Sequence, residues 1–173
     1  MNPGTPVSLL PLVHVILSLV GIASGIVVVF GLWQNTLLSR WTAIFLVTTA
    51  ATSATGFLFF SASFGPPHIV GIVSLVVLAL ASWGLYASHL VAGWRRVYTI
   101  GAILALYLNV FVGVAQAFQK IPYLRAMAPT QKEPPFLIAQ AVVLILFVLA
   151  GAVALKRFHP AGEKLQAAPA PAG

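Results

Sequence analysis

The residues best suited to chemistry are two histidines and three amides that stand inside or at the edge of long apolar runs. They are His14, His68, Asn109, Gln116 and Gln140. Imidazole nitrogens bind haem iron, and amide groups both donate and accept hydrogen bonds. Ionisable and strongly polar side chains are costly in an apolar segment, so each is a candidate functional residue. We take these five residues as one candidate cofactor-binding cluster.

The composition excludes several other chemistries. The chain has no cysteine, which excludes disulfides, thiolate metal sites and iron–sulfur clusters. It has no aspartate, and its two acidic residues lie outside the apolar runs. The chain therefore lacks the residues that serine–histidine–aspartate catalysis, hard-metal sites and carboxylate-driven cation transport require. Catalysis by the chain alone, without a cofactor, is not expected.

The same composition predicts an all-α integral membrane protein. Hydrophobic residues make up 60% of the 173 positions and charged residues 6%, whereas soluble domains carry about a quarter charged residues. The apolar residues fall in blocks of about 20 or more, the length that crosses a hydrocarbon core about 30 Å thick. Backbone polar groups in that core must be satisfied within their own segment, so each block should be helical.

We predict five transmembrane helices, over residues 8–33, 41–64, 68–90, 97–118 and 136–155. Short loops join the first four helices, which favours an up-down bundle of four. The fifth helix follows a longer outer connector, whose prolines predict an extended, stiff segment. This segment is either a plain linker between the spans or a lid over the cluster. Residues 1–157 form a single transmembrane domain, and the Ala/Pro-rich residues 158–173 form a disordered cytoplasmic tail.

The flanking basic residues predict the orientation. One side collects Arg40, Arg95, Arg96, Lys156, Arg157 and Lys164, and the other collects Lys120, Arg125 and Lys132. The positive-inside rule makes the richer side cytoplasmic, which places the N-terminus outside. The composition suggests an inner (plasma) membrane. The net charge of +7 is spread over the ends of the apolar blocks, so it indicates contact with the lipid bilayer and not with nucleic acid.

Residue spacing brings the polar residues together. In the first span one helical face carries His14, Ser18, Gly21 and Gly25, and in the fourth span one face carries Ala102, Ala105, Asn109, Gly113 and Gln116. Small residues on such faces let neighbouring helices approach closely. Because successive spans alternate in direction, both histidines and both glutamines of the cluster should lie within about 10 Å of the outer boundary, with the asparagine deeper.

Each polar residue also has a structural interpretation. His68 could face water at a helix start, and His14 could hydrogen-bond to a neighbouring helix. The amides could join helices through bonds of about 0.6–2 kcal/mol each. The hydroxyls of the second span can bond to carbonyls of their own helix. These hydroxyls belong to Thr48, Thr49, Thr52, Ser53 and Thr55.

Three functions follow. The first is a non-catalytic accessory or binding subunit that associates with itself or another membrane protein through its small-residue faces. The alternative is a redox module that binds one haem b or a quinone near the outer leaflet through His14 and His68. If haem is present, these two histidines are the expected axial ligands of its iron. A further alternative is a passive small-solute channel or carrier along the second span and Asn109.

Overall fold

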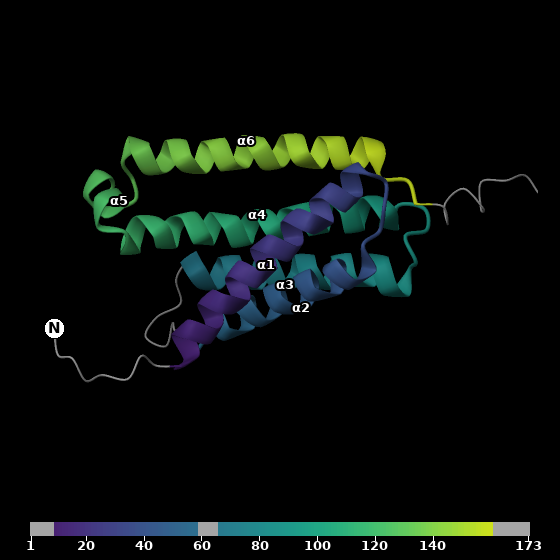
Figure 1. Ribbon diagram of the computed structural model, residues 1–173, viewed down its shortest axis with the longest axis horizontal. Coiled ribbons are helices and arrows are strands. Elements are labelled where there is room, and N and C mark those ends of the chain that lie inside the picture. The colour runs from purple at the N-terminus through teal and green to yellow at the C-terminus, as the bar shows by residue number, and fades with distance from the viewer. Residues whose placement is uncertain (1–8, 59–65, 161–173) are drawn as a thin grey trace, which may run out of the picture.

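The computed structural model describes residues 9–58 and 66–160, and every regular element within them is helical. This agrees with the predicted all-α fold. The elements, shown in Figure 1, are α1 (Leu9–Trp33), α2 (Ser39–Gly56), α3 (Pro66–Ser82), the π-helix η1 (Trp83–Ala87), α4 (Trp94–Lys120), α5 (Pro122–Met127) and α6 (Pro134–Arg157). Most of the predicted tail lies outside the described residues.

Four helices in the described residues are long and apolar enough to cross a membrane. They are Leu9–Trp33, His68–Ala87, Trp94–Lys120 and Pro134–Arg157. Each overlaps a predicted span. The second predicted span, residues 41–64, corresponds to α2, which has 18 described residues and is rich in Ser and Thr. Residues 59–64 lie outside the described part of the chain, so the described residues establish four candidate spans and not five.

The long helices form a ring of four with a fifth beside it. Each of α1, α2, α3 and α4 contacts the next, and α4 contacts α1 to close the ring. In Figure 1, α6 runs alongside α4, against which it packs most extensively. The start of α1 and the end of α6 lie at opposite ends of the molecule.

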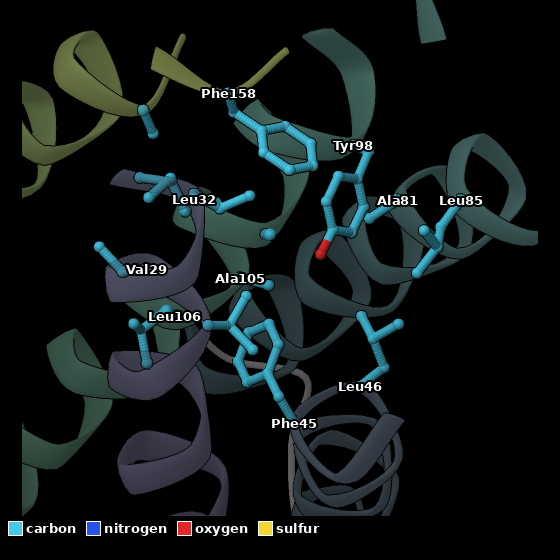
Figure 2. Close-up of a cluster of buried hydrophobic side chains, with 14 of the residues drawn as sticks. Val29, Leu32, Phe45, Leu46, Ala81, Leu85, Tyr98, Ala105, Leu106 and Phe158 are labelled. Carbon is cyan, nitrogen blue, oxygen red and sulfur yellow. The ribbon is translucent and has the colours of Figure 1, made fainter. Parts of the chain in front are cut away.

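The hydrophobic core fills the half of the ring that holds the end of α1 and the start of α4. Figure 2 shows its largest members, including Phe45, Tyr98 and Leu106, each at most 1% exposed. Gly25 makes this packing possible, because a Cβ there would lie 2.6 Å from Leu106 Cδ1 and 2.9 Å from the Phe45 ring. The small-residue face predicted for the first span therefore packs within the chain.

The outside of the bundle is apolar. Large side chains such as Leu19, Ile138 and Val148 are each about 60% exposed, and similar residues cover α1, α3 and α6. Soluble monomers rarely expose contiguous apolar surface on this scale. The exterior is therefore suited to lipid.

The third span ends earlier than predicted. Its last turn is the π-helix η1, after which His89, Leu90 and Ala92 all have positive φ. The Leu90 N–H donates to the Gly84 carbonyl at 2.9 Å, and the Leu90 side chain is buried. The tight turn replaces the predicted helical residues 88–90 because burial of Leu90 offsets the cost of the left-handed backbone.

The sequence places Arg95 among the basic residues that flank the spans, but the structure buries its side chain. Arg95 stands in the first turn of α4 and is only 6% exposed. Its Nη1 donates to the Phe158 carbonyl at 2.7 Å and to the Leu155 carbonyl at 3.4 Å. These carbonyls belong to the C-terminal end of α6, where a cation is favoured by the helix dipole. Arg95 therefore fastens α6 to α4.

We predict that Arg95→Met lowers the free energy of unfolding by about 2 kcal/mol, because hydrogen bonds from charged donors contribute about 1.5–3 kcal/mol. Denaturation of the purified protein by increasing SDS in mixed micelles measures this loss. The matched control is Arg96→Met, since Arg96 is adjacent and exposed. Equal losses in the two variants would show that Arg95 does not fasten α6.

Candidate functional site

The half of the ring opposite the core contains a cavity of about 470 Å³. This volume lies in the range of small-molecule sites, about 300–1,000 Å³. The walls are mostly apolar and come mainly from the C-terminal halves of α2 and α4, the N-terminal half of α3 and the start of α6. They include Phe57, Val70, Leu108, Phe111, Val112 and Phe136.

Four of the five residues predicted as a cluster line this one cavity. They are His14 from α1, His68 from α3, and Asn109 and Gln116 from α4. Gln140 of α6 does not line it, because its Nε2 donates instead to the Phe111 carbonyl at 3.1 Å. Gln140 therefore joins α6 to α4, as the structural interpretation of the amides expected.

His14 is held by the end of α2. Its Nδ1 lies 2.8 Å from Thr55 Oγ1. Thr55 Oγ1 also lies 2.8 Å from the carbonyl of Ala51, four residues earlier on α2. The tautomer of His14 decides which of the two side chains donates in the bond between them, and in either case the bond ties α1 to the end of α2.

His68 is buried rather than facing water. It is 8% exposed near the start of α3, and its ring centroid lies 5.8 Å from that of Phe57 with the planes tilted by 49°. The interpretation of His68 as a water-facing imidazole is therefore wrong. Its ring packs against Phe57, from the other side of the α2–α3 connection.

Asn109 and Thr49 lie at the inner end of the cavity. Both line it, and they are 7% and 1% exposed. Ser18 Oγ donates to Asn109 Oδ1 at 2.9 Å, which fixes the orientation of the amide. Asn109 Nδ2 and Thr49 Oγ1 have no hydrogen-bond partner among the described residues. A Cβ added at Gly21 would lie 3.0 Å from each of these two atoms.

Thr49 departs from the back-bonding predicted for the hydroxyls of the second span. Thr48, Thr52 and Thr55 each donate to the carbonyl four residues earlier, at 2.7–2.8 Å. Thr49 makes no such bond, and Ser53 instead donates to Ser74 of α3 at 3.1 Å. No signal in the sequence separates Thr49 from its neighbours, since only the packing of α2 on α1 places its hydroxyl beside Gly21.

The connector between α4 and α6 is partly helical, which corrects the predicted extended segment. Pro122 begins α5 at a first-turn position, where the missing N–H costs nothing. Further along, Thr130, Gln131 and Lys132 line the cavity. Gln131 Nε2 donates to the Ala115 carbonyl of α4 at 2.7 Å, so the connector is tied against the cavity. Sequence reasoning missed these three residues as contributors to the site.

In the described ranges, 9–58 and 66–160, no group of three or more His, Cys, Asp or Glu side chains is placed to hold a metal ion. The comparisons with protein-family models, curated proteins and solved structures find no match to this chain. The arrangement of the residues is therefore the basis for any functional conclusion.

Glu133 shapes the connector next to the cavity. Its Oε1 accepts from Thr130 Oγ1 at 2.8 Å and from the Thr130 N–H at 3.1 Å, and its Oε2 accepts from the Lys132 N–H at 3.0 Å. Desolvation acts to raise the pKa of Glu133, but the hydrogen bonds outweigh it and leave the pKa below its ordinary value.

We predict that the NMR chemical shifts of the Thr130 and Lys132 amide protons change together as Glu133 is protonated. The midpoint of this change should lie below the ordinary glutamate pKa of about 4.3. Because the folded pKa is lowered, the carboxylate's contribution to the connector is complete near neutral pH and is lost as the pH falls through that midpoint. A pH series of NMR spectra of isotope-labelled protein measures it. The titration should vanish in Glu133→Gln, and a midpoint at or above 4.3 would contradict the prediction.

Proposed function

We propose that this chain is a multi-pass inner-membrane protein whose role is the non-catalytic binding of an apolar ligand in the cavity lined by His14, His68, Asn109 and Gln116. The observation that carries the proposal is the contrast between the two halves of one helix ring. One half is closely packed, and the other holds a partly open cavity of about 470 Å³, a volume in the range of small-molecule sites, with polar groups at defined points.

We further propose that α2 is the fifth span and that the N-terminus lies outside. The 18 residues of α2 rise about 27 Å at 1.5 Å each, close to the hydrocarbon thickness. Back-bonded threonines lower the cost of its hydroxyls in lipid. An odd number of crossings also agrees with the opposite positions of the start of α1 and the end of α6. The distribution of basic residues supports the orientation.

The other roles derived from the sequence have less support. The small-residue face of α1 is used against α2 and α4, so it does not argue for association with a second copy or another membrane protein. Beyond Asn109, the described residues are closely packed around Phe45 and Leu106, which argues against a passive channel. An accessory role remains compatible with binding.

We predict that native mass spectrometry of the detergent-purified protein detects a co-purified small molecule and that Gly56→Leu removes it. Gly56 lines the cavity, and a Cβ there would have only His14 Cε1 within 4 Å, at 3.7 Å. A leucine therefore extends into the space that a ligand occupies. Gly93→Leu is the matched control, because a Cβ at Gly93 meets nothing within 4 Å and lies away from the cavity. Equal retention in both variants would contradict the proposal.

Binding of one haem b is the second candidate. The observation that favours it is that His14 and His68 line the same cavity from different helices. Haem supplies one-electron chemistry when bound, and the two imidazoles would hold its iron.

Absorption spectra of oxidised and reduced protein, expressed with adequate haem, separate the two candidates. Haem b predicts a Soret band that sharpens on reduction and is lost in both His14→Ala and His68→Ala. Binding of a colourless or weakly coloured ligand predicts no Soret band in any of these proteins. His159→Ala, which changes a histidine outside the cavity, is the control for the histidine substitutions.

A further inference from the structure

The cavity has a polar end that the connector covers. The polar residues at this connector end are Gln116, Gln119, Thr130, Gln131 and Lys132. The connector end lies close to the membrane boundary, because Lys120 is the first charged residue of α4 after Arg96. A charged ligand group placed there keeps part of its hydration, so it avoids the cost of burying a charge in hydrocarbon.

Lys132 gives the connector end a positive charge. Among the described residues that line the cavity, Lys132 is the one with a permanent charge, and it is exposed. Its ammonium stands on a flexible four-carbon stem, so it can reach over the opening. The neighbouring Glu133 carboxylate is held by Thr130 and by the Lys132 N–H. No ion pair holds the Lys132 ammonium within the ranges that the structure describes, so it is available to a ligand.

The surroundings of Lys132 are also positive. Lys120 ends α4 one residue after Gln119, Arg125 lies in α5, and Glu133 is the acidic residue of the same segment. In the orientation proposed above this segment is outside, where basic residues are less frequent than in cytoplasmic loops. A positive potential at the opening of an apolar cavity attracts an anion, which accounts for basic residues in this position.

The rest of the cavity suits a hydrocarbon chain. Leu108, Phe111 and Val112 line it from α4, and Phe57 lines it from the end of α2. From Leu108 to Gln119 the lining extends about 16 Å along α4, at 1.5 Å per residue. An extended apolar space with a cation at one end matches an amphiphile, which has a chain for the walls and a headgroup for the cation.

We propose that the ligand is an anionic amphiphile whose headgroup lies beside Lys132 and whose hydrocarbon chain extends along α4 toward Leu108. The proposal rests on the binding function proposed above and specifies the charged group of its ligand. The Gln116 amide lines the same end and can donate hydrogen bonds to the headgroup. A carboxylate and a phosphate monoester share this chemistry, so the source is a fatty acid or a phosphorylated lipid.

The test uses the full-length protein in a neutral detergent and three probes with chains of equal length. They are dodecanoate, dodecyl phosphate and dodecanol, which has no charge. Titrations at mildly alkaline pH, followed by native mass spectrometry, give an apparent dissociation constant for each probe. Partition of a probe into the micelles is the same for every variant, so the variants can be compared directly. The anion that binds more tightly identifies the source, carboxylate or phosphate.

We expect Lys132→Gln to weaken binding of the preferred anion about fivefold, equivalent to about 1 kcal/mol and typical of an exposed ion pair, and to leave dodecanol binding unchanged. Lys132→Arg keeps the charge and should retain binding of the anion. Lys156→Gln is the matched control, because Lys156 is an exposed lysine in the last turn of α6 that does not line the cavity. Gly56→Leu, which extends into the cavity, should remove binding of all three probes.

The outcomes separate this inference from the function on which it rests. If Lys132→Gln affects anion binding no more than Lys156→Gln does, or weakens dodecanol binding by the same factor, Lys132 does not recognise a headgroup and the inference is wrong. Loss of dodecanol binding in Gly56→Leu would then still support the cavity as a binding site. If Gly56→Leu leaves the binding of every probe unchanged, or if none of the probes binds, the proposed binding function is wrong as well.

Discussion

The close approach of α1 to α2 and α4 determines where the bundle is packed and where it is hollow. At Gly25 the absence of a side chain lets Phe45 and Leu106 meet the helix backbone, and the core builds outward from that contact. One turn earlier, at Gly21, the neighbours are the polar groups of Asn109 and Thr49 instead. Thr49 and Asn109 also line the cavity, so the closely packed core gives way to the cavity near this turn of α1.

Polar groups in this bundle follow two patterns. Most are satisfied by backbone carbonyls: Thr48 by its own helix, Gln140 by α4 and Arg95 by the end of α6. Such bonds hold helices together in an environment that offers no water. The amide nitrogen of Asn109 and the hydroxyl of Thr49 are exceptions among the described residues, and both lie against Gly21 of α1.

The sequence predicted the helices well, because long apolar runs and helical spacing are local properties. It also brought His14, His68, Asn109 and Gln116 to one region, since alternation of direction and residue depth are enough to do so. Whether these residues bind a ligand stays a prediction. The helical part of the connector was missed because its prolines suggested an extended chain, although a proline at the first position of a helix loses no hydrogen bond.

The sequence by itself determined the all-α class, the apolar helices and the small-residue faces, because composition and the 3.6-residue period do not depend on distant neighbours. Only the tertiary structure decided the burial of Arg95 and His68, since Arg95 bonds to the end of α6 and His68 packs against Phe57 across the α2–α3 connection. It alone distinguished Thr49 from Thr48 on one helix. Which hydroxyl bonds to its own backbone and which faces a neighbouring helix depends on the packing of that helix, and side-chain pattern does not encode that contact.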